Sequence, residues 1–216
     1  MTQRQIVFVH GGDTFPDREL FLSYLRSATP REPLWSPDAS VRWRETLARR
    51  FSDSCEIVMP MMPNRQNARY DEWSLWLERH VPFLRDGVIL VGHSMGGIFL
   101  AKYLSENVFP VRIGMLALVA APFDDETNGS LGDFVLSDNL ENVSRQVGTI
   151  LLFHSQDDPA VPFTECAKYA RALPEAETIV LDGRGHFLDP DFPELSERMG
   201  RMIGGYDGTG RTGRSR

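Results

Sequence analysis

Ser94 is the residue of this chain best placed to act as a nucleophile. It lies within GVILVGHSMGG, residues 87–97, where an apolar run ends in Gly-His-Ser-Met-Gly. Glycines two positions before and two positions after the serine, Gly92 and Gly96, permit the sharp strand-to-helix turn called a nucleophile elbow. Such a turn holds the hydroxyl out at the carboxyl end of a sheet. The pattern predicts a reactive serine; an incidental serine in a glycine-rich turn is the alternative.

A serine hydroxyl needs a base to take its proton, usually a histidine that a carboxylate orients. In proteins with this elbow, the acid and then the histidine follow the serine along the chain. Of the five histidines, only His154 and His186 come after Ser94. His154 ends an expected strand, with no loop before it to hold an acid. His186, in the glycine-rich GRGHF after the last expected strand, is the predicted base.

The acid is expected after the penultimate strand, where HSQDDPAVP offers Asp157 and Asp158. Asp158 is favoured because Pro159 after it fixes the turn. Asp157 is expected to face solvent. Asp182 is a weaker candidate because it lies only four residues before His186.

Strands and helices alternate along the chain. Short apolar runs without alternation predict buried strands, and apolar residues at helical spacing predict the helices between them. The expected strands are 6–9, 56–59, 88–91, 113–121, 149–153 and 178–181. The expected helices are 41–51, 70–84, one from the elbow to about Asn107, a short one at 139–146, 163–173 and 193–203. This alternation predicts a mostly parallel sheet with helices on both faces and no large cap.

Two segments stand outside this alternation. Residues 13–41 are long for a strand-to-helix connection, and they combine helical spacing at 20–25 with prolines at 30, 33 and 37. A lid or pocket wall and a packed surface loop are equally open for them. Residues 206–216 are predicted to be a disordered tail, which leaves 1–205 as one domain.

Composition excludes several classes of function. A net charge of -7 argues against a nucleic-acid partner. No apolar run approaches the roughly 20 residues of a membrane span, and no signal peptide is visible, so a cytoplasmic location is expected. Cys55 and Cys166 show no metal-ligand spacing and are expected to be buried thiols, with no metal site.

Taken together, the His-Gly-Gly after the first strand, GHSMGG, SQDDPAVP and GRGHF resemble the α/β-hydrolase superfamily over residues 6–203. The small size, the lack of a cap and the MPMMP segment before an aromatic helix are similar to a compact branch of bacterial serine hydrolases related to retinoblastoma-binding protein 9. The resemblance implies a triad of Ser94, Asp158 and His186 and no cofactor. It also implies strand order 2-1-3-4-5-6, because the two leading antiparallel strands of larger members are missing.

The resemblance also indicates where an oxyanion would be stabilised. One backbone N–H donor is expected from Met95, directly after the nucleophile. The second is expected from the loop after the first strand, at Gly12, with Asp13 as the second choice.

These residues predict hydrolysis of an ester, thioester or related acyl bond of a small-molecule substrate through an acyl-enzyme on Ser94. Met61, Met62, Phe123 and Phe187 follow strand ends and are the expected walls of an apolar substrate pocket. Ordinary hydrophobic cover is an equally open interpretation of these four. A non-catalytic binding or scaffold protein, and lyase or cofactor-free peroxidase chemistry, remain alternatives on the same fold.

Overall fold

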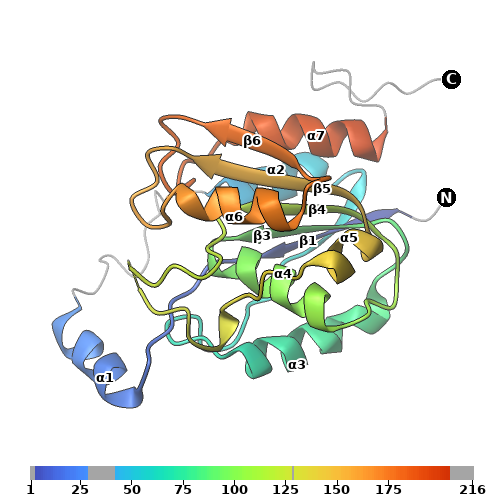
Figure 1. Ribbon diagram of the computed structural model, residues 1–216. Coiled ribbons are helices and arrows are strands. Elements are labelled where there is room, and N and C mark those ends of the chain that lie inside the picture. Colours follow the sequence, from blue (N-terminus) through green and yellow to red (C-terminus); the bar gives the residue numbers. More distant parts are fainter. Residues whose placement is uncertain (1–2, 29–41, 128, 205–216) are drawn as a thin grey trace, which may run out of the picture.

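A six-stranded sheet in the order β2-β1-β3-β4-β5-β6 forms the centre of the computed structural model (Figure 1), which describes residues 3–28, 42–127 and 129–204. Each neighbouring pair of these strands is parallel. The expected order is therefore confirmed, and within the described residues this sheet is parallel throughout rather than mostly parallel. Parallel pairing brings the carboxyl ends of all these strands to one edge, where ligands bind in such folds.

The strands lie within a few residues of their expected positions. They are β1 (Arg4–Val9), β2 (Cys55–Val58), β3 (Val88–His93), β4 (Ile113–Val119), β5 (Val147–Ser155) and β6 (Glu177–Leu181). Strand β4 ends two residues before the predicted end, because Ala120 has φ 47 and leaves the extended conformation. Strand β5 begins earlier than predicted, because Val147 already pairs with Ile113.

The helices follow the predicted order. They are α1 (Arg18–Ser27), α2 (Trp43–Phe51), α3 (Tyr70–His80), α4 (Met95–Glu106), α5 (Glu141–Gln146), α6 (Thr164–Ala172) and α7 (Pro193–Ile203). Helix α3 ends before its predicted limit at Leu84, and a 3-10 turn at Val81–Phe83 follows it. Pro82 accounts for the change, because it has no N–H for the next helical hydrogen bond.

Helices cover both faces of the sheet, as predicted. Helices α2 and α7 pack on one face, and α3, α4, α5 and α6 pack on the other (Figure 1). On α2, the residues at four-residue steps, Trp43, Leu47 and Phe51, are all buried. On α3, Trp73 and Leu77 are buried, whereas Trp76 is 41% exposed. The predicted buried thiols Cys55 and Cys166 are buried and free.

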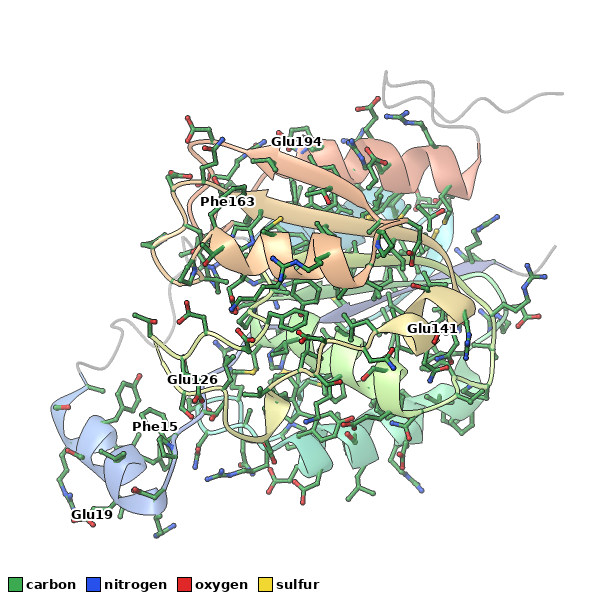
Figure 2. The ribbon with its side chains drawn as sticks, viewed as in Figure 1. Phe15, Glu19, Glu126, Glu141, Phe163 and Glu194 are labelled. Atoms are coloured by element: carbon green, nitrogen blue, oxygen red, sulfur yellow. The ribbon has the colours of Figure 1, made fainter. Side chains whose placement is uncertain are left out.

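Helix α1 lies apart from the body of the molecule (Figure 1) and has no buried residue. Its N-cap is Asp17, whose carboxylate accepts a hydrogen bond from the Leu20 N–H at 2.8 Å. Phe15 lies beside the helix (Figure 2), with its ring centroid 5.3 Å from that of Phe21 and 5.1 Å from that of Tyr24. Local aromatic packing therefore accompanies the capped start of α1.

Two sequence predictions fall outside the described residues. These are the proline-containing part of the 13–41 segment, from residue 29 on, and the disorder of residues 206–216. None of the helices in the described part of the chain is long and apolar enough to cross a membrane. The cytoplasmic location stays a prediction.

Candidate active site

Ser94 occupies the turn between β3 and α4, as the sequence predicted. Its backbone has φ 54 and ψ -123, a conformation that side-chain-bearing residues rarely adopt. Holding a non-glycine residue there costs about 1–3 kcal/mol, which the surrounding structure must offset. The Ser94 N–H donates to the Val119 carbonyl at 2.8 Å, so the strained turn is anchored to the neighbouring strand β4. Strain of this kind is concentrated at functional positions.

The two elbow glycines are required by close backbone contacts. A Cβ atom on Gly92 would lie 2.4 Å from the Gly96 carbonyl oxygen. A Cβ atom on Gly96 would lie 2.4 Å from the Val9 carbonyl oxygen and 2.6 Å from that of His10. Both distances are far inside van der Waals contact, so any side chain at either position would open the turn.

His186 and Asp158 form a hydrogen-bonded pair. The Nδ1 atom of His186 lies 2.9 Å from Oδ2 and 3.1 Å from Oδ1 of Asp158. An ionised carboxylate only accepts hydrogen bonds, so Nδ1 carries the proton in the neutral ring and Nε2 is left as an acceptor. A base of this tautomer is what a serine nucleophile requires.

The Asp158 carboxylate is buried and ionised. Its Oδ1 atom accepts hydrogen bonds from the N–H groups of Ala160 at 2.8 Å and Val161 at 3.0 Å. Burial by itself would raise the pKa of Asp158, but the hydrogen bonds from His186, Val161 and Ala160 outweigh it and hold the pKa below its ordinary value. The carboxylate therefore faces the histidine as a charged partner.

The neighbouring Asp157 has a different partner set. Its Oδ1 atom accepts hydrogen bonds from the Ser155 hydroxyl and from the Gly185 N–H, the latter at 3.2 Å. Asp157 thus ties β5 to the loop that carries His186, while Asp158 contacts the imidazole itself. The structure brings Asp158, and neither Asp157 nor Asp182, against the His186 ring within the described residues.

The loop around His186 is fastened at two backbone carbonyls. The Trp43 indole Nε1–H donates to the Phe187 carbonyl at 2.9 Å. The His93 Nε2 atom lies 2.9 Å from the His186 carbonyl, which can only accept, so His93 is protonated at Nε2. Sequence analysis missed both residues, because only the fold brings β3 and α2 against this loop.

His93 is held as a neutral ring. Burial, together with the nearby charge of His186, lowers the pKa of His93 to about 3. The Trp43 ring packs edge-on against it, with centroids 5.8 Å apart. A neutral, packed imidazole directly before the nucleophile therefore supports the backbone of the predicted base.

A further ion pair holds the same loop from outside. The Arg184 Nη2 atom lies 2.7 Å from each carboxylate oxygen of Glu194, in the first turn of α7 (Figure 2). At a partly exposed site, such an ion pair contributes little to the free energy of folding, but its two-oxygen geometry fixes the orientation of the loop. The loop is therefore fastened on both sides of His186.

The loop after β1 lies against Ser94, because a Cβ atom on Gly11 would be 3.2 Å from the Ser94 Cβ, and the next residue, Gly12, lines the same cavities as Ser94. His10 fastens this loop, because its Nδ1 atom lies 2.7 Å from the Gly11 carbonyl and its Nε2 atom accepts the Met62 N–H at 2.9 Å. Burial lowers the pKa of His10, which keeps the ring neutral and able to accept at Nε2.

The backbone N–H groups of this loop differ in their partners. The Asp13 N–H, the second choice for the oxyanion, donates to the Arg65 carbonyl at 2.8 Å. The Gly12 N–H makes no hydrogen bond within the described residues. Met95 is the first residue of α4, where N–H groups have no partner inside the helix. Gly12 and Met95 thus stay the better pair of candidate donors.

Two cavities meet at Ser94, and both are lined by Gly12, Asp13, Ser94 and His186. The smaller, about 270 Å³, is polar and will be called the arginine cavity, because Arg42, Arg44 and Arg65 line it. The larger, about 590 Å³, will be called the apolar cavity. Its apolar walls include Phe15, Pro16, Leu20, Tyr24, Leu131 and Val161.

The four residues predicted as pocket walls lie in different surroundings. Phe187 lines the arginine cavity, but the other three residues line neither of the two cavities. Met61 is 79% exposed, whereas Met62 and Phe123 are buried in the core. Phe123 packs against Tyr169, with ring centroids 5.0 Å apart. The first part of the 13–41 segment supplies apolar walls in their place, which favours the pocket-wall interpretation of that segment.

Comparisons with known proteins agree with this architecture. A family model described as serine hydrolase matches residues 33–195. The serine hydrolase RBBP9 of Rattus norvegicus is 29% identical over 145 residues, which are 66% of this chain and 75% of the rat protein. The crystal structure of the ydeN gene product from B. subtilis has a TM-score of 0.73 and 19% identity, and the match covers 93% of this chain and 98% of that one. A putative YdeN-like hydrolase from Pectobacterium atrosepticum has a TM-score of 0.64 and 20% identity, over 93% and 91% of the two chains. At these identities the solved structures bear on the fold alone, which is the α/β-hydrolase fold that the sequence predicted.

Proposed function

Since the chain belongs to the serine hydrolase family, we propose that it hydrolyses an ester, thioester or related acyl bond of a small substrate through an acyl-enzyme on Ser94. The observation that carries the proposal is the His186–Asp158 pair, at 2.9 Å, beside a strained serine that lines the same two cavities as the histidine. The pair supports the proposal because a serine nucleophile needs a histidine base of this tautomer, and that histidine needs a carboxylate to orient it.

In the first step, the Ser94 Oγ atom attacks the substrate carbonyl carbon while His186 Nε2 accepts the hydroxyl proton. The carbonyl oxygen becomes an oxyanion, and the N–H groups of Gly12 and Met95 would stabilise it. Asp158 stabilises the imidazolium that forms. The carbon–oxygen or carbon–sulfur bond of the substrate then breaks, and the imidazolium returns its proton to the leaving alcohol or thiol.

In the second step, water attacks the acyl-enzyme carbonyl while His186 Nε2 accepts a proton from that water. The second oxyanion collapses, the bond between the acyl carbon and Ser94 Oγ breaks, and Ser94 recovers its proton from His186. The products are a carboxylic acid and the free enzyme. These steps use only side chains, backbone N–H groups and water.

The apolar cavity indicates one part of the substrate. Its walls are half-exposed apolar side chains of α1 and buried ones of the body, among them Leu20, Tyr24, Leu131 and Val161. An apolar acyl or alcohol group placed there would remove these surfaces from water, which stabilises binding by about 25 cal/mol for each Å².

Hydrolysis of 4-nitrophenyl butyrate tests the proposal. The wild type should release 4-nitrophenol, and Ser94→Ala should lower kcat by roughly 10³-fold or more. Ser105→Ala is the matched control, because Ser105 lies on the same helix and its hydroxyl donates to the Lys102 carbonyl at 2.7 Å. Activity in Ser94→Ala equal to that of the wild type would exclude this mechanism.

A further inference from the structure

The arginine cavity places positive charge directly beside Ser94. Arg42 and Arg44 lie at the start of α2, and Arg65 lies in the loop after β2. The whole chain carries a net charge of -7, so three arginines around one cavity reverse the sign locally. The carboxylate of Asp13 is the one acidic side chain among the described residues that line this cavity.

The charges of Arg42 and Arg65 act on the partly buried guanidinium of Arg44. The Arg44 side chain is 16% exposed, and its contact with Glu45, at 4.0 Å, is at the outer limit of an ion pair. Burial lowers the pKa of Arg44, Glu45 raises it, and the charges of Arg65 and Arg42 lower it again. Keeping like charges together in a partly buried site is unfavourable until an anion joins them.

This inference rests on the proposed function and names the substrate class. We propose that the substrate carries an anionic oxygen group, a carboxylate or phosphate, on one side of its acyl bond, and that Arg42, Arg44 and Arg65 bind that group. The other side of the bond is apolar and occupies the apolar cavity. The enzyme therefore selects a substrate with one charged and one apolar arm.

Chemistry and geometry both support this assignment. A guanidinium group offers N–H donors in a planar fork that fits two oxygens of a carboxylate or phosphate. The arginine cavity, at about 270 Å³, has room for a short chain ending in such a group. The Arg65 carbonyl accepts the Asp13 N–H at 2.8 Å, which fixes the loop of Arg65 to the loop of Gly12. An anion bound by the arginines is thus held at a set distance from the reacting carbonyl.

Matched ester pairs test the proposal and locate the charged arm. The first pair is the 4-nitrophenyl monoester of adipic acid and its neutral terminal amide, which place the charge on the acyl side. The second pair is 4-carboxyphenyl butyrate and 4-carbamoylphenyl butyrate, which place it on the leaving group. In at least one pair, kcat/KM of the wild type should be about tenfold higher for the anionic member, as expected for one charge-assisted contact.

The variants are compared through the ratio of kcat/KM for the anionic and neutral members, which corrects for any general loss of activity. Arg44→Gln and Arg65→Gln should each reduce this ratio severalfold, and the triple variant that also carries Arg42→Gln should abolish the preference. Arg44→Lys should restore part of it, because the charge returns without the planar fork. Arg112→Gln is the control; Arg112 is an arginine at the amino-terminal end of the sheet, beside β4, and it should leave the ratio at the wild-type value.

Thermal unfolding supplies a readout that does not need turnover. Adipate or inorganic phosphate should raise the Tm of Ser94→Ala, and Ser94→Ala with Arg42, Arg44 and Arg65 all replaced by Gln should show no rise. A rise with only one of the two anions identifies that anion as the group recognised. The proposal is overturned if the anionic member is preferred in neither pair, or if the triple variant keeps the anionic preference. If the wild type hydrolyses none of these esters but an anion still raises the Tm, the proposed function is wrong and the anion-binding site is supported.

Discussion

The Nδ1 atom of His186 faces both oxygens of Asp158, at 2.9 and 3.1 Å. The same carboxylate accepts two backbone N–H groups of the following turn, so its position does not depend on the histidine alone. This arrangement fixes the ring orientation and leaves Nε2 unprotonated in the neutral state. In this pair, the geometry determines which tautomer the neutral His186 ring adopts.

Asp158→Asn should lower kcat by roughly 10³- to 10⁴-fold with little effect on KM, because the amide favours the wrong histidine tautomer. Steady-state kinetics with 4-nitrophenyl butyrate measures the effect. Asp157→Asn is the matched control, since the Asn side-chain oxygen can still accept the Gly185 N–H. A larger loss in Asp157→Asn than in Asp158→Asn would mean that the acid has been assigned to the wrong residue.

Much of the fold could be predicted because short sequence patterns determine the individual strands, turns and helices. The apolar run of β3, the glycines at 92 and 96 and the apolar face of α4 each determine their own structure over a few residues. Chain order then placed His186 and Asp158 at the ends of neighbouring strands. Parallel pairing brings such ends together without any further information.

His93 should make the free energy of unfolding depend on pH. Its pKa is about 3 in the folded protein, against about 6.5 when unfolded, so the unfolded chain binds the extra proton first. Stability contributed by the neutral ring is present above about pH 6.5 and is lost as the pH falls toward 3. The free energy of unfolding can be measured by urea denaturation at several pH values between 6 and 4 and plotted against pH. The slope of this plot should be shallower by about 1.4 kcal/mol per pH unit in His93→Gln than in the wild type. His80→Gln, at the end of α3, controls for removal of an imidazole, and equal slopes in wild type and His93→Gln would contradict the prediction.

Gly96→Ala should destabilise the protein by about 3 kcal/mol, at the upper end of the usual cost of overpacking. The added Cβ would lie 2.4 Å from the Val9 carbonyl oxygen, a backbone atom that cannot rotate away. Gly148→Ala, whose Cβ would find its nearest neighbour at 3.1 Å, should cost clearly less. Chemical denaturation measures the free energy of unfolding of the two variants. An equal loss in both would mean that the turn at Ser94 is less tightly packed than its geometry indicates.

Leu20 and Tyr24 of α1 should influence chain-length preference, because they line the apolar cavity. We expect Leu20→Ser and Tyr24→Ser to lower the ratio of kcat/KM for 4-nitrophenyl octanoate over butyrate by about 3- to 10-fold, given that each buried methylene contributes about 0.8 kcal/mol and both side chains are half exposed. Leu75→Ser, at an exposed site on α3, is the control. An unchanged ratio in both α1 variants would show that α1 is not a substrate wall.

The parts of the site that the sequence did not predict depend on side-chain orientations and on contacts between distant segments, which only the folded structure determines. Met62 and Phe123 follow strand ends, as expected of wall residues, but the chain turns both side chains into the core. The arginine cavity joins the start of α2 to the loop after β2, and no local pattern signals that these two segments meet at Ser94. His93 reads from the sequence as a variable position of the elbow, and its support of the His186 carbonyl appears only in three dimensions.

Covalent labelling by a fluorophosphonate tests the central claim, that Ser94 is an activated nucleophile, most directly. The account predicts that peptide mass spectrometry finds the phosphonyl adduct on Ser94 in the wild type. It also predicts no adduct in Ser94→Ala and wild-type labelling in Ser105→Ala. An unlabelled wild type, or a Ser94→Ala variant labelled as fully as the wild type, would contradict the account.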